Sequence, residues 1–184
     1  MRMRFVSEFI TLIMAVSWLS TFPAFGQTKA DLKAVHERLT HEVRHALMML
    51  PRYSIFDILE FEITGVDTVI LSGQVTRPSL KSDAESAVRS LEGVGTLVNK
   101  IDVLPISPDD DRIRIAVYRA IFSKTGLDRY FMRAVPPIHI IVKNGAITLM
   151  GIVATEMDKN VAGLAAREVP GAFGVTNNLK VENR

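Results

Sequence analysis

The stretch VILSGQV at residues 69–75 decides the fold, because it returns as ITLMGIV at residues 147–153. The same offset of 78 residues aligns residues 61–103 with residues 139–181 without a gap, and 11 of these 43 aligned positions are identical. Most of the identical pairs are apolar residues, glycines or an asparagine. An internal repeat of this spacing predicts two copies of one small folded unit.

Each copy begins with the pattern of an amphipathic helix. In the first copy apolar residues recur at Val35, Leu39 and Val43, and the offset places apolar residues at the equivalent positions of the second copy. A spacing of four residues puts these side chains on one face of a helix. We therefore predict helices over residues 31–50 and 110–124.

Two strands follow the first helix in each copy. In the second copy, runs at residues 138–143 and 146–153 flank Asn144-Gly145, a pair that favours a two-residue hairpin turn because both residues tolerate positive φ. Residues 64–67 provide a looser turn at the equivalent place in the first copy. Both copies are therefore expected to contain an antiparallel hairpin.

A helix with small apolar residues and a last strand complete each copy. Gly93 and Gly171 end the two helices, as expected for a left-handed cap. The last strands are predicted at residues 97–104 and 175–181, parallel to the strand before the helix, because such crossovers are right-handed. The predicted fold class is α+β, with two tandem α-β-β-α-β units that each pack a three-stranded mixed sheet against two helices.

The N-terminus has the pattern of an export signal. Arg2 and Arg4 precede an apolar run at residues 9–19, and Ala24-Phe25-Gly26 supplies small residues for cleavage. We predict a cleavable signal peptide at residues 1–26 and a periplasmic location. The run is short for a spanning helix, which needs about 20 residues, and an uncleaved membrane anchor is the alternative.

Two prolines in LPISP, residues 104–108, predict a short and stiff connector between the two units. The predicted domains are accordingly residues 27–104 and residues 105–184. A unit of about 75 residues has a marginal core by itself. The two units are therefore expected to pack against each other.

The composition excludes several kinds of protein. None of the 184 residues is a cysteine, which rules out disulfides, thiolate metal sites, thiol catalysis and a cysteine-linked lipid anchor. A formal net charge of +2 gives no indication of a nucleic-acid partner. The sequence also shows neither a nucleophile placed beside a histidine nor a dinucleotide fingerprint. We expect no enzymatic activity, no cofactor and no metal.

The repeated unit resembles the BON domain. The resemblance lies in the V-x-L-x-G-x-V stretch at residues 69–75, Gly93-Val94 and VNKIDV at residues 98–103, and the second copy repeats these motifs in register. It implies a periplasmic module that binds phospholipid surfaces or envelope partners without catalysis of its own. Unlike the lipoprotein members, this chain has no cysteine to acylate.

His41-Glu42-Val43-Arg44-His45 matches the H-E-x-x-H pattern of zinc hydrolases. At 100° per residue, however, His41 and His45 point away from the apolar face of the predicted helix. The second copy has arginine and serine at the two histidine positions, so the repeat does not need the motif. A solvated helix face is expected, with a zinc metallohydrolase as a remote alternative and surface metal binding as another.

Charge and aromatic residues differ between the copies. Residues 27–104 hold 9 basic and 11 acidic residues, whereas residues 105–184 hold 11 basic and 8 acidic ones. Basic side chains interleaved with apolar ones suit the interface of an anionic bilayer. The candidate lipid- or partner-binding residues are Arg119, Lys124, Arg129, Tyr130, Phe131 and Arg133. Alternatively, the two aromatic residues complete the small core and the basic ones are merely solvated.

Two further segments are candidate contact surfaces. Ile115, Tyr118 and Phe122 lie off the core face of the second copy's first helix, where they would pack on the first copy or on an external partner. Residues 51–57 form an aromatic loop that serves either recognition or turn packing. The function predicted is a non-enzymatic exported module that binds anionic phospholipid surfaces or an envelope complex, with a soluble stress-response or chaperone-like protein as the alternative. The oligomeric state is left open.

Overall fold

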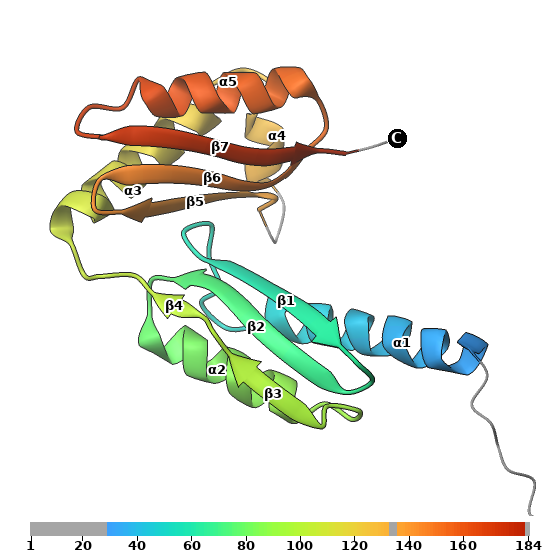
Figure 1. Ribbon diagram of the computed structural model, residues 1–184. Helices are drawn as coiled ribbons and strands as arrows, with labels where there is room; N and C mark the ends of the chain where they lie inside the picture. Colours follow the sequence, from blue (N-terminus) through green and yellow to red (C-terminus); the bar gives the residue numbers. More distant parts are fainter. Residues whose placement is uncertain (1–28, 133–135, 183–184) are drawn as a thin grey trace, which may run out of the picture.

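The computed structural model describes residues 29–132 and 136–182, so the predicted signal segment lies outside the described residues. The first unit contains α1 (Lys29–Met48), β1 (Ile58–Thr64), β2 (Thr68–Val75), α2 (Pro78–Arg89), β3 (Thr96–Asn99) and β4 (Asp102–Val103) (Figure 1). The second contains α3 (Pro108–Phe122), α4 (Asp128–Phe131), β5 (Ile138–Lys143), β6 (Ala146–Val153), α5 (Glu156–Arg167) and β7 (Gly174–Val181). No helix in these two described ranges is long and apolar enough to cross a membrane.

The two sheets have the predicted mixed topology. β1 pairs with β2 and β5 pairs with β6 in antiparallel fashion, whereas β2 pairs with β3 and β4, and β6 with β7, in parallel. The turn residues Asn144 and Gly145 have φ values of 52° and 76°, as the hairpin prediction requires. The α+β fold of two repeated units is therefore confirmed. Helix α4 was not predicted from the sequence.

The repeated glycine of the central strands is explained by a close backbone approach. Gly73 and Gly151 have φ values of 116° and 118°, a region that favours glycine. A Cβ atom on either residue would collide with a carbonyl oxygen, that of Ile58 in the first unit and that of Pro137 in the second. The absence of a side chain on each glycine thus allows the first residues of the paired strand, β1 or β5, to approach closely.

The repeated asparagine attaches the last strand to the helix before it. Nδ2 of Asn99 donates to the carbonyl of Lys81 at 3.2 Å, and Nδ2 of Asn177 donates to that of Lys159 at 2.7 Å. The predicted single strand at residues 97–104 is interrupted between β3 and β4, because the N–H of Ile101 donates to the Asn99 side chain at 3.1 Å. The pairing register with β2 is the same on both sides of the interruption.

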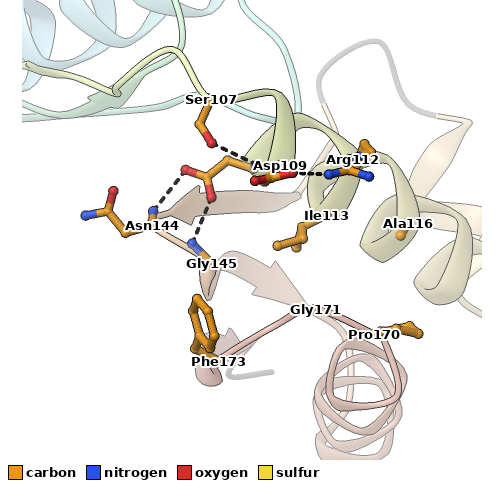
Figure 2. A pocket seen from close by; sticks show the side chains of 11 residues that line it. Ser107, Asp109, Arg112, Ile113, Ala116, Asn144, Gly145, Pro170, Gly171 and Phe173 are labelled. Atoms are coloured by element: carbon orange, nitrogen blue, oxygen red, sulfur yellow. Dashed lines mark hydrogen bonds and ion pairs between the residues drawn. The ribbon is translucent and has the colours of Figure 1, made fainter.

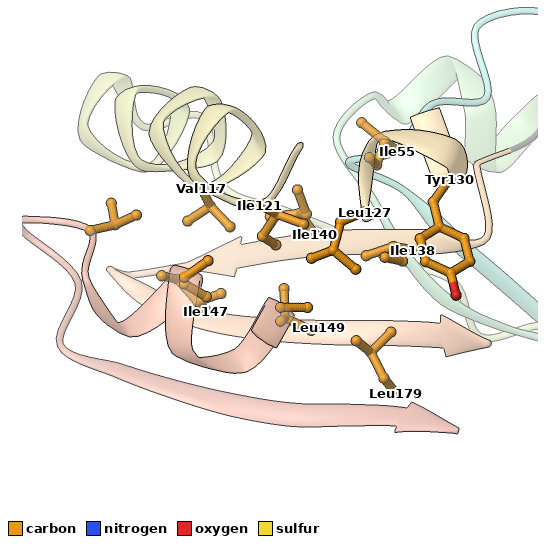
Figure 3. Packing of buried hydrophobic residues seen from close by; sticks show 14 of the residues in the cluster. Ile55, Val117, Ile121, Leu127, Tyr130, Ile138, Ile140, Ile147, Leu149 and Leu179 are labelled. Carbon is orange, nitrogen blue, oxygen red and sulfur yellow. The ribbon is translucent and has the colours of Figure 1, made fainter. Parts of the chain in front are cut away.

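Each unit has its own apolar core on the helix-covered face of its sheet. In the second unit α3 and α5 supply Val117, Ile121 and three buried alanines, which pack against Ile140 and Leu149 of the sheet (Figure 3). The first unit has an equivalent cluster between α1, α2 and its own sheet. One residue of the first unit, Ile55, belongs to the core of the second.

The expected packing of the two units on each other is confirmed. Ile58 and Leu104 of the first unit form a buried cluster with Ile141 of β5. The N–H of Ile140 donates to the carbonyl of Ile55 at 2.7 Å, so the loop before β1 lies along the edge of the second sheet. Because β5 faces its own helices on one side and the first unit on the other, five of its six residues are buried.

Candidate functional site

An aromatic cluster lies on the outer side of helix α3. The ring centroid of Tyr118 is 5.1 Å from that of Phe122 and 5.7 Å from that of Phe131 in α4. Phe56, in the loop before β1, meets Tyr118 edge-on at 6.3 Å. Two uses were predicted for this helix face, packing on the first unit or contact with an external partner. Tyr118 packs on the first unit, and the loop of residues 51–57 takes part in that packing.

The outer end of this cluster remains exposed. Phe131 and Met132 are 51% and 83% exposed, and Ile115 is 42% exposed. Arg119 is exposed on the same helix and forms no ion pair within the described residues. We call this region the α3–α4 surface; it comprises Ile115, Tyr118, Arg119, Phe122, Phe131 and Met132.

Tyr130 lies in the core and is not part of the α3–α4 surface. The side chain is 3% exposed, and Figure 3 shows its ring beside the core residues of the second sheet. Its hydroxyl group donates to Asp158 at 2.9 Å and accepts from the N–H of Ala154 at 2.8 Å. Of the two alternatives for this residue, a place in the core is the one that the structure shows.

Arg129 contacts both the hydroxyl of Tyr130 and the carboxylate of Asp158. Its guanidinium group forms an ion pair with Asp158 and donates to the Tyr130 hydroxyl at 3.2 Å. Burial would raise the pKa of Asp158, but hydrogen bonds from Thr155 and Tyr130, together with the charge of Arg129, lower that pKa below its ordinary value. The Arg129 side chain is thus held toward its own domain, although half of it is exposed.

The remaining predicted cations are differently placed. Lys124 pairs with Glu168 of the segment after α5 at 3.0 Å, which partly neutralises its charge. Arg133 lies outside the described residues. Among the predicted basic residues that the structure describes, Arg119 is the one without an internal ion pair.

The histidine pair of α1 is solvated, as expected. His41 and His45 are both exposed, and their rings lie parallel within 1° with centroids 6.4 Å apart. Glu42 faces Arg38 at 3.9 Å. The described part of the chain holds no group of three or more metal-ligating side chains. Catalytic zinc sites have three protein ligands, so the described residues do not complete such a site around this motif.

A cavity of about 800 Å³ lies at the end of the second unit where α3 begins (Figure 2). Asp110 is buried there, and its carboxylate accepts hydrogen bonds from the N–H groups of Asn144 at 2.9 Å and Gly145 at 2.8 Å. The carboxylate thus holds the hairpin turn against the helix. Phe173 stands at the rim and is 88% exposed. Sequence reasoning missed this cavity, because its lining combines the first turns of α3 with two connecting segments that are distant in the sequence.

Comparison with known proteins identifies the repeated unit. The family model described as the BON domain matches residues 42–105 and residues 109–183. The chain belongs to the BON domain family. Each match falls on one of the two units, so this is a tandem BON-domain protein and, like its family, an envelope-associated module.

Two solved structures are similar to the tandem BON domains. One is the C-terminal domain of CdsD, a structural protein of the type III secretion system of Chlamydia trachomatis, with 12% identity, a TM-score of 0.32, and coverage of 79% of this chain and 98% of that chain. The other is also CdsD, with 12% identity, a TM-score of 0.31, and coverage of 79% and 92%. No curated protein matches the sequence.

Proposed function

We propose that this protein is an exported, non-catalytic module of the cell envelope that associates with anionic phospholipid surfaces through its second BON domain. The observation that carries the proposal is the exposed pair Phe131 and Met132 beside the unpaired Arg119. Apolar side chains next to a free cation match the boundary between acyl chains and anionic headgroups.

Apolar insertion contributes more to this binding than charge does. Full burial of a Phe or Met side chain is worth about 1.5–3 kcal/mol, and Phe131 and Met132 both protrude enough to gain part of it. A basic residue near an anionic surface adds about 1 kcal/mol. Lys124 and Arg129 already have acidic partners, so Arg119 is the chief described cation. Arg133 directly follows Met132 in the sequence.

Export supports an envelope location. Residues 1–26 have the charge and apolar pattern of a cleavable signal peptide, which would deliver domains at residues 27–104 and 105–184 to the periplasm. If the segment stays uncleaved, it anchors the same two domains at the membrane. In either case the α3–α4 surface is on the side of the inner membrane that faces the periplasm.

A soluble protein-interaction role is the second candidate. It is favoured by Phe173, whose nearly complete exposure at the rim of the 800 Å³ cavity is unusual for a phenylalanine. Phe173 precedes β7, whereas α4 contacts the opposite end of β6 through Tyr130 and Ala154. The two candidate surfaces can therefore be tested separately.

Flotation of the purified protein with vesicles tests the lipid proposal. Vesicles of phosphatidylglycerol and phosphatidylethanolamine are expected to carry the protein upward at low salt, and vesicles of phosphatidylcholine are expected to carry much less. The bound fraction should fall as salt is raised, because the Debye length shortens from about 30 Å at 0.01 M to about 10 Å at 0.1 M.

Matched variants locate the binding surface. The double change Phe131→Ser and Met132→Ser should weaken vesicle binding about tenfold, and Arg119→Glu about fivefold. Phe173→Ser and Arg167→Glu alter an even more exposed phenylalanine, 88% against 51% for Phe131, and an exposed arginine elsewhere, and both should leave binding unchanged. Absence of flotation at low salt would refute the lipid proposal. Loss of binding in Phe173→Ser alone would move the site to the other end of the domain.

A further inference from the structure

A groove of about 390 Å³ runs between the two BON domains. Its walls come from the end of α1 and from β1 in the first domain, and from β5, β6 and the segment before β5 in the second. Most of the wall is apolar and includes Leu47, Met48, Phe61 and Ile152. Met48 is 43% exposed and Ile152 is 54% exposed, so the apolar wall is open to solvent from both domains.

One unpaired cation stands at this groove. Arg44 is exposed on α1 and contributes to the lining. Two other arginines of the first domain have acidic partners, Arg38 with Glu42 and Arg89 with Glu85. Arg44 forms no ion pair with any residue in the described ranges. The guanidinium group is therefore free to bind an anion.

Two aromatic side chains of the inner wall of the groove are neutral near neutral pH. Tyr53 of the first domain stacks on His139 of β5 with ring centroids 5.6 Å apart. His139 is 6% exposed, and its Nδ1 atom has no hydrogen-bond partner among the described residues. Burial lowers the pKa of His139, which keeps the imidazole neutral, and raises that of Tyr53 to about 12, which keeps the phenol neutral. Among the residues that line the groove, Arg44 is therefore the one that is charged near neutral pH.

We propose that this groove binds one unbranched fatty acid of medium chain length, with the acyl chain between the two domains and the carboxylate at Arg44. An apolar trough with a single guanidinium group complements an unbranched chain with one anionic end, and arginine binds a carboxylate through two parallel N–H donors. The volume is near the lower end of the range of ligand pockets, about 300–1,000 Å³, which suits one chain better than the two chains of a phospholipid. The site shares no residue with the α3–α4 surface, so it stands apart from the proposed membrane binding.

Titration of the purified protein with sodium laurate, below its critical micelle concentration, tests the site. Calorimetry is expected to show saturable binding of one laurate per chain. In methyl-labelled protein the Met48 signal should shift, whereas that of Met157, which is 74% exposed on α5, should not. Dodecanol, which has the chain without the charge, should bind more weakly. Tighter binding of lauroyl-lysophosphatidylglycerol than of laurate would overturn the assignment to a fatty acid.

Charge variants separate the groove from general adhesion of the ligand. Ile152→Glu places a carboxylate in the groove and should weaken laurate binding at least tenfold; the control Leu164→Glu changes a side chain of matching exposure, 56% against 54%, on α5. Arg44→Glu should weaken binding about fivefold, with Arg167→Glu as its control. Met48→Glu serves if Ile152→Glu fails to fold by circular dichroism.

The outcomes of the two sets of experiments are independent. Ile152→Glu should float with anionic vesicles as the unmodified protein does, since the residue lies outside the α3–α4 surface. Absence of saturable laurate binding, or equal losses in the groove variants and their controls, would refute the fatty-acid site without affecting the membrane proposal.

Discussion

Replacement of Ile55 by alanine should loosen the attachment of the two BON domains to each other. Ile55 belongs to the loop before β1 of the first domain but is packed in the core of the second, where it is 8% exposed. Its carbonyl group also accepts a hydrogen bond from the N–H of Ile140 at 2.7 Å. The side chain therefore anchors this backbone contact between the domains.

The expected loss follows from the atoms removed. Isoleucine and alanine differ by three carbon atoms, and at about 0.8 kcal/mol for each buried CH₂ the transfer term is about 2.4 kcal/mol. The cavity left behind raises the total destabilisation to about 3 kcal/mol. For a chain of this size such a loss lowers the midpoint of thermal unfolding by about 6–12 °C.

Urea unfolding followed by circular dichroism, together with small-angle scattering, measures both consequences. The unmodified protein should unfold in one transition, and Ile55→Ala should unfold at lower urea with a larger radius of gyration before unfolding. Ile106→Ala is the matched control, because Ile106 in the connector is 95% exposed and its truncation should change stability by no more than about 0.5 kcal/mol. If both variants behave like the unmodified protein, Ile55 does not hold the domains together.

Three other changes test particular contacts. Burial lowers the pKa of His139 in the folded state, so the unfolded state binds a proton at higher pH than the folded state does. The free energy of unfolding should therefore fall as the pH drops below about 6.5. In urea titrations at pH 7 and pH 5, His139→Phe should show a smaller fall. Gly151→Ala should lower the free energy of unfolding by at least about 2 kcal/mol in thermal unfolding, because φ is 118° and the added Cβ would meet a backbone oxygen. The control Gly174→Ala should be near neutral, because its Cβ would meet no atom within 4 Å. Tyr130→Phe removes one of the hydrogen bonds to the buried Asp158 carboxylate and the acceptor of the Ala154 N–H, and should cost about 1–3 kcal/mol. Tyr118→Phe, whose hydroxyl has no hydrogen bond within the described residues, should cost much less. Equal losses in either pair, or an unchanged pH profile in His139→Phe, would contradict the corresponding contact.

The repeat predicted the strands of the second domain correctly because each signal was local. Asn144-Gly145 marked the hairpin through its tolerance of positive φ, and β5 and β6 end and begin at the residues expected. The first helix of each domain was likewise found from apolar residues four positions apart, although α3 begins two residues earlier than predicted, at Pro108. The short helix α4 was missed, since four residues carry no detectable period.

The candidate site was predicted less well than the fold. Tyr130 and Phe131 are neighbours in one short helix and look equivalent in the sequence, yet one is 3% and the other 51% exposed. No local pattern separates them, because the difference arises from the hydrogen bonds of Tyr130 to Asp158 and to Ala154. Likewise, the charges of Lys124 and Arg129 were visible in the sequence, but their acidic partners lie more than 25 residues away along the chain.

The duplicated unit could be read from the amino-acid sequence without the structure. The fold of the unit places requirements on particular backbone positions, and the same requirements therefore occur twice at one offset. Glycine where a carbonyl group leaves no room for Cβ, and asparagine where the last strand meets the preceding helix, are the clearest examples. The differences in burial between the two copies became visible in the folded protein. Burial of Ile55 and His139 between the domains, and exposure of Phe131 and Met132, depend on which distant segment covers each side chain, and a single sequence does not record those contacts.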